Sequence, residues 1–206
     1  MRQQVSRLKL GLSLVADTFK QAKLEYDGKK VNVFVAENDA EGKEVSFWDK
    51  GELKETCIGE EAIKTYPAGP RHKITEVNAF VFQNEWDRLA YMQAKNLKEK
   101  KADQLHVVTN GLIAEAAAFI LQEDRVKTVY NYLNFDEGDQ QGHAFTLSME
   151  EAGIYCPSLN HVYGEKSLSE ALADDYMGVG RKLGPVEPKV YHEPTAQNVY
   201  KAAPKL

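Results

Sequence analysis

The stretch from Asn78 to Leu172 repeats one unit, in which a short apolar run is followed by polar residues and then by a helical pattern. Its four apolar runs are Asn78–Gln83 (NAFVFQ), Leu105–Asn110 (LHVVTN), Val126–Asn134 (VKTVYNYLN) and Leu159–Tyr163 (LNHVY). Strands that alternate with helices are typical of a parallel sheet in an α/β fold. The repeat therefore predicts a small, four-stranded, mainly parallel sheet flanked by helices. A functional site is expected at the carboxyl ends of its strands.

The residues on either side of this repeat have different patterns. A helix is predicted over 2–23, where apolar residues recur at spacings of three and four. Strand-like runs separated by turns predict an antiparallel β meander over 31–58. Residues 184–206 contain four of the seven prolines, which is typical of an extended or disordered tail. The predicted parts are a helix-and-meander subdomain, an α/β domain and a tail, at 1–74, 75–180 and 181–206.

Composition and charge narrow the class of protein. The 206 residues are 43% hydrophobic and carry a formal net charge of −5, so nucleic acid could be bound only through a local basic patch or a metal. Cys57 and Cys156 lie far apart without a metal-ligand spacing, and no signal peptide is recognisable, which favours a reducing cytosol. No apolar run approaches the roughly 20 residues that span a bilayer. We therefore expect a soluble, cytoplasmic protein without a membrane partner.

Acidic residues gather after the third apolar run. Asp136, Glu137 and Asp139 lie in the connection between that run and the next helical pattern. Carboxylate oxygens are the ligands that Mg²⁺ prefers in proteins. The cluster therefore predicts a magnesium site. The alternative is a solvated acidic loop, because Asp and Gly are ordinary turn residues.

Two segments give the chain a resemblance to a known family. Phe80–Leu89 (FVFQNEWDRL) is a strand that breaks directly into a helix, and Leu133–Ala144 (LNFDEGDQQGHA) is a strand end followed by acids and glycines. Together they resemble the Toprim domain shared by bacterial primases, topoisomerases and related nucleases. The primase-like and mobilisation-type versions from bacterial mobile elements are the most similar. The resemblance covers about residues 78–177 and implies magnesium-dependent chemistry on a phosphodiester.

The acidic loop matches the family's Asp-x-Asp-x-x-Gly motif in either of two registers. With a two-residue insertion, the motif falls on Glu137-x-Asp139-x-x-Gly142. Without the insertion it falls on Asn134-x-Asp136, and Asp139 then replaces the glycine. The carboxylates at these positions hold magnesium ions in the family, so both registers imply a metal site in this loop.

The match after the first strand is degenerate. The family's Glu-Gly pair falls on Gln83 and Asn84. A carboxamide brings no negative charge and cannot exchange a proton near neutral pH, whereas general acid–base help is typically worth about 10²–10⁴ in rate. Glu85 and Asp87, in the first turn of the next helix, are the other candidates for a relic or alternative acid–base role. For Gln83 and Asn84 the alternative is helix capping.

Three cations are candidates for binding nucleic acid. Arg71 and Lys73 follow a turn rich in proline and glycine, and the alternative for them is a solvated loop. Lys166 lies where the family has its Lys-Asp-Leu-Asn segment, so its role is implied by the resemblance.

The resemblance and the amide at Gln83 together predict a nucleic-acid-associated protein of a mobile element or phage with impaired catalysis. It would act by binding DNA, RNA or a protein partner. One alternative is an active magnesium-dependent nuclease, nicking or primase-type enzyme that uses Glu85 and the acidic loop. A second is an interaction protein whose tail after Gly184 binds a host enzyme.

Overall fold

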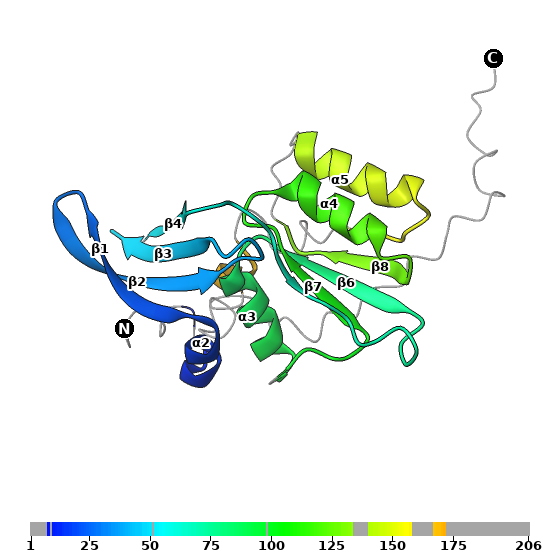
Figure 1. Cartoon of the computed structure of the whole chain (residues 1–206), viewed down its shortest axis with the longest axis horizontal. Coiled ribbons are helices and arrows are strands. Elements are labelled where there is room, and N and C mark those ends of the chain that lie inside the picture. Colours follow the sequence, from blue (N-terminus) through cyan, green and yellow to red (C-terminus); the bar gives the residue numbers. More distant parts are fainter. Residues whose placement is uncertain are drawn as a thin grey trace, which may run out of the picture.

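A computed structural model describes residues 8, 10–50, 52–97, 99–133, 140–157 and 167–171, which form two sheets (Figure 1). The first sheet is antiparallel in the order β1-β2-β3-β4, and the second has the order β5-β7-β6-β8. The strands are β1 (Lys20–Tyr26), β2 (Lys29–Glu37), β3 (Lys43–Asp49), β4 (Glu52–Ile58), β5 (Lys64–Tyr66), β6 (Val77–Phe82), β7 (Gln104–Val108) and β8 (Val126–Asn131). The described helices are α2 (Leu12–Thr18), α3 (Glu85–Ala94), α4 (Ile113–Gln122) and α5 (Gln140–Glu151).

The second sheet confirms the mixed α/β class and the first three predicted strands. β6 lies at its centre and pairs in parallel with both β7 and β8, whereas β5 pairs with β7 in the antiparallel sense. The sheet is therefore mixed, and its fourth described strand is the short β5. The run Leu159–Tyr163, predicted as the fourth strand, lies outside the described residues.

Helices cover both faces of this second sheet. Because side chains alternate along a strand, Val81 of β6 points toward α4 and α5, while Phe82 points toward α3. Figure 1 shows α4 and α5 side by side over one face. Strands buried on both faces read as nearly continuous apolar runs, which explains why β6 and β7 could be predicted. Within the described residues, no helix combines the length and apolar character needed to cross a membrane.

The predicted helix over 2–23 is wrong from Lys20 onward. In the described part only α2 is helical there, and Lys20–Tyr26 form β1, which pairs along its whole length with β2. Asp27 and Gly28 close this hairpin with positive φ angles of 51° and 70°. Asp-Gly between two strands is a strong hairpin signal, and pairing with β2 outweighs the helical spacing of the apolar residues.

Ser167 and Glu170 cap the helical turn at 167–171. The backbone N–H of Ser167 donates to Glu170 Oε2 at 3.2 Å, and the N–H of Glu170 donates to Ser167 Oγ at 3.3 Å. This reciprocal pair is a capping box, which satisfies two N–H groups that would otherwise have no partner at the start of the helical turn.

His106 should make the protein sensitive to acid. It is fully buried against Phe80, Phe82 and Tyr91, and burial lowers its pKa to about 3, with Arg88 adding to the effect. Below pH 6.5 this histidine is protonated in the unfolded chain but not in the folded one. The free energy of unfolding therefore falls by about 1.4 kcal/mol per pH unit as the pH drops from 6.5 toward 3.

Urea unfolding tests this assignment. Between pH 7 and pH 4, the free energy of unfolding of His106→Leu should fall by about 3 kcal/mol less than that of the unaltered protein. Equal losses in the two proteins would contradict this assignment.

Candidate functional site

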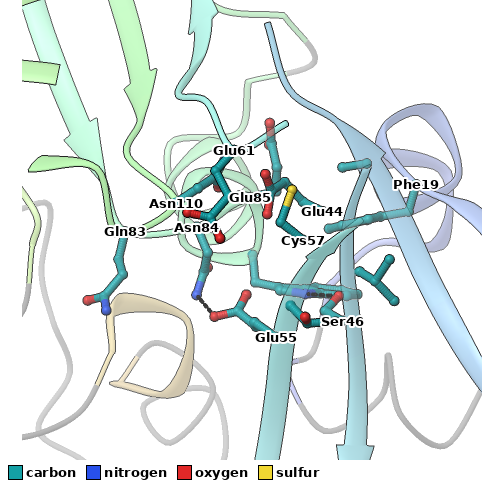
Figure 2. Close-up of a pocket in the computed structure, with 15 residues that line it drawn as sticks. Phe19, Glu44, Ser46, Glu55, Cys57, Glu61, Gln83, Asn84, Glu85 and Asn110 are labelled. Atoms are coloured by element: carbon teal, nitrogen blue, oxygen red, sulfur yellow. Dashed lines mark hydrogen bonds between the residues drawn. The ribbon is translucent and has the colours of Figure 1, made fainter. Parts of the chain in front are cut away.

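A pocket of about 310 Å³ lies where the two sheets meet, at the carboxyl ends of β6 and β7 (Figure 2). Residues of β3 and β4 form one wall, and the turns that lead into α3 and α4 form the other. The carboxylates and amides that line the pocket are Glu44, Glu55, Glu61, Gln83, Asn84, Glu85 and Asn110. The pocket therefore lies at the sheet edge where the sequence predicted a site.

The wall of this pocket is acidic. None of the described lining residues is Lys or Arg. Desolvation raises the pKa of Glu55 to about 7, although this side chain keeps contact with solvent. A hydrogen bond that Asn84 Nδ2 donates to Glu55 Oε2 at 3.1 Å opposes the rise, while the charges of Asp87 and Glu44 add to it. The pocket as a whole disfavours a phosphate group.

Gln83 is exposed at the end of β6. Its backbone carbonyl accepts hydrogen bonds from Asn110 N at 3.0 Å and from Thr109 Oγ1 at 3.4 Å, which fixes this strand end against the end of β7. In Figure 2 its side chain points away from Glu44 and Cys57. The position that the resemblance assigns to a glutamate thus lies at the sheet edge and carries an uncharged amide.

Asn84 is the N-cap of α3. Its backbone is extended (φ −145°), and its side-chain oxygen accepts a hydrogen bond from Asp87 N at 3.0 Å. The capping alternative is therefore confirmed for Asn84, and the same side chain also contacts Glu55 through its nitrogen. One residue both starts the helix and shapes the pocket.

Glu85 lies in the interior and is 5% exposed. Arg88 Nε donates to Glu85 Oε2 at 2.6 Å, and the Tyr66 hydroxyl donates to Glu85 Oε1 at 2.6 Å. The Arg88 guanidinium also lies 3.9 Å from the centre of the Tyr66 ring. Both carboxylate oxygens of Glu85 are therefore engaged by side chains that hold α3 against β5.

Asp87 is 1% exposed and contacts a distant part of the chain. Its Oδ1 accepts a hydrogen bond from Ser169 N at 2.8 Å. Burial raises its pKa to about 6, and hydrogen bonds from Ser169 act in the opposite direction. Asp87 thus ties α3 to the helical turn at 167–171.

The acidic loop and one of the predicted cations fall outside the part of the chain that the structure describes. Asp136, Glu137, Asp139 and Lys166 lie outside the described residues, as does the tail. The described residues contain no group of three or more His, Cys, Asp or Glu side chains able to hold a metal ion. Magnesium binding by the acidic loop stays a prediction from the sequence.

Arg71 and Lys73 lie at the opposite end of the second sheet. Arg71 makes ion pairs with Asp124 at 2.6 Å and Glu123 at 3.3 Å, just before β8 begins. The six residues of β6 separate this end from the pocket by about 20 Å. The structure therefore does not bring these two cations together with Gln83.

Sequence reasoning missed the wall that β3 and β4 contribute. Alternation in β3 places Glu44 on the same face as Ser46 and Trp48, a polar–apolar mixture that could have indicated a face toward a site. Trp86 of α3 donates from Nε1 to Ser46 Oγ at 2.9 Å and so positions this wall against α3.

No protein-family model matches this sequence, and a search of curated proteins also found no match. Among solved structures, the chain is similar to a chain in the complex of bacteriophage T7 lagging-strand DNA polymerase with the primase domains of two gp4 subunits, an RNA/DNA hybrid and dTTP. The TM-score is 0.40 and the identity 17%, over 72% of this chain and 71% of that chain.

Proposed function

We propose that this chain is a Toprim-like binding protein that associates with nucleic acid and has no phosphodiester chemistry of its own. The observation that carries the proposal is the state of Glu85, whose two oxygens are held by Arg88 and Tyr66 in the interior. Gln83 stands at the family's glutamate position, and Asp87 is buried as well. Neither of the two acids that follow Gln83 in α3, Glu85 and Asp87, is thus exposed so that it could replace the glutamate.

Nucleic acid would have to be bound outside the pocket, because the acidic wall repels phosphate. Arg71, Lys73 and Lys166 remain the candidates. In this proposal the protein belongs to a mobile element or phage and acts in the cytoplasm. Magnesium, where it is bound, would be held by the loop with Asp136 and Asp139.

Restoring the acid at Gln83 tests the loss of catalysis. We expect the unaltered protein to leave single-stranded and duplex DNA and RNA intact with Mg²⁺ or Mn²⁺. Gln83→Glu returns a carboxylate to the end of β6, and magnesium-dependent cleavage at least about tenfold above background is expected in this variant alone, because the missing acid–base group is worth about 10²–10⁴. Gel analysis of end-labelled substrates measures both.

The matched control is Gln122→Glu, which makes the same chemical change at an exposed residue at the end of α4. It should stay inactive.

The Asp136→Asn/Asp139→Asn double variant should abolish any calorimetric signal for Mg²⁺ or Mn²⁺. Robust cleavage by the unaltered protein would contradict the proposal and favour the active enzyme. Failure to bind labelled single-stranded DNA at low salt, measured by anisotropy, would contradict the association with nucleic acid.

A further inference from the structure

The two faces of the antiparallel sheet are packed differently. Phe34, Ala36 and Trp48 point toward α2 and α3 and share a core with them. The opposite face has an apolar cluster of its own, in which no described helix takes part. Its members are the buried residues Val33, Val45 and Phe47, with the partly buried Leu24, Val31 and Val35 around them. An antiparallel sheet with one solvated face normally has polar residues there, so this second apolar face suits a partner.

A groove of about 360 Å³ is formed on this second face. Its apolar floor consists of Ala22, Leu24, Val33, Val35, Val45 and Ile58. Ile58 is 48% exposed, and Tyr26, on the same face, is 42% exposed. Val33 and Val45 are each only 2% exposed. The groove therefore offers mainly Ala22, Leu24 and Ile58 to a ligand that approaches from solvent.

The rim of the groove has an excess of positive charge. Lys20, Lys23, Lys43 and Glu37 line it. Lys20 pairs with Glu37 at 2.9 Å. Lys23 and Lys43 are exposed and form no ion pair with any described residue. A ligand that carries carboxylates beside apolar groups would complement this surface.

The groove also borders a strand edge. β1 is the first strand in the order of its sheet, and six of its seven residues are exposed. Figure 1 shows the β1–β2 hairpin at the end of the molecule farthest from α4 and α5. An edge strand has backbone N–H and C=O groups that can pair with another chain. Lysines on an edge also hinder aggregation, but that protective role does not require an apolar floor beside them.

We propose that an extended segment of a partner protein, with alternating apolar and acidic residues, adds to β1 as a fifth strand. Its backbone would pair with the edge of β1, and its apolar side chains would cover Ala22 and Leu24. Its carboxylates would lie on the other side near Lys23, while Lys43 strengthens the attraction. Backbone pairing supplies affinity in this mode and alternate side chains supply specificity. This surface goes beyond the proposed function, since it binds protein at a place apart from Arg71 and Lys73.

Fluorescence anisotropy with the full chain tests the charge requirement. The probe is a labelled eight-residue peptide that alternates valine and glutamate, and its counterpart alternates valine and lysine. The glutamate peptide should bind at least about tenfold more tightly. Lys23→Glu/Lys43→Glu should weaken its binding about tenfold, since two attractions become repulsions. The control Lys101→Glu/Lys127→Glu changes two exposed lysines elsewhere and should have no effect.

Two N-methylated versions of the glutamate peptide test the pairing with β1. Each blocks every second backbone N–H, so one version should lose binding and the other should keep it, because only alternate groups face the partner strand. Equal binding of both versions, equal binding of the glutamate and lysine peptides, or no binding would each overturn the proposal. Dimerisation of the chain that Lys23→Glu/Lys43→Glu abolishes would assign the edge to a second copy instead. None of these outcomes would contradict the proposed binding of nucleic acid, which is tested separately.

Discussion

Replacing Trp86 with alanine is expected to lower the free energy of unfolding by about 3–5 kcal/mol, the range for a fully buried large aromatic residue. Trp86 is 1% exposed. Its ring stacks on Phe19 at a centroid distance of 4.3 Å and meets Phe34 and Trp48 edge-on, each at 5.1 Å. Its indole N–H also donates to Ser46. One side chain of α3 therefore fills the space between this helix and the antiparallel sheet.

Guanidinium unfolding followed by circular dichroism measures this effect. Trp48→Ala is the matched control, because Trp48 belongs to the same cluster but is only half-buried. It should cost clearly less than Trp86→Ala. Trp86→Phe should retain most ring contacts while leaving Ser46 Oγ without its donor, at about 1–3 kcal/mol. A loss for Trp86→Ala no larger than that for Trp48→Ala would contradict the central position of Trp86.

The parts of the fold that could be predicted depend on local sequence. β6 and β7 are buried on both faces, so their residues read as largely apolar runs whatever their partners are, whereas β8 keeps Lys127 exposed. β1 could not be separated from α2 by periodicity, because its strand conformation comes from pairing with β2. Only the Asp27–Gly28 turn pointed to that pairing.

The site was harder to predict than the fold. The edge that holds Gln83 follows from the strand–helix alternation, but the other pocket wall does not. Glu55 meets Asn84 across 29 residues of sequence, and only the packing of α3 on β3 and β4 brings them together. Nor does the sequence show that Glu85 faces inward, because that depends on how α3 is rotated against β5.

Removing Arg88 should be as damaging as removing Trp86. The Arg88→Met variant would leave Glu85 buried and charged without its cation, and breaking one side of a buried ion pair typically costs about 3–5 kcal/mol. The side chains of Arg88 and Glu85 are only 7% and 6% exposed, so water cannot replace the lost partner. Urea unfolding at pH 7 measures this loss.

The double variant Glu85→Gln/Arg88→Met separates a structural role for Glu85 from a catalytic one. If Glu85 is held for stability, the double variant should recover most of the loss, because no buried charge is left unpaired. Tyr66 can still donate its hydroxyl to the glutamine oxygen. A residue kept for catalysis behaves differently: Glu85→Gln alone would then raise stability while abolishing a magnesium-dependent activity, since sites kept for function are often strained. If Glu85→Gln destabilises the protein and changes no reaction with nucleic acid, the role of Glu85 is structural. The acidic pocket that Glu85 lines would then result from the packing of the two sheets and would not be a catalytic site.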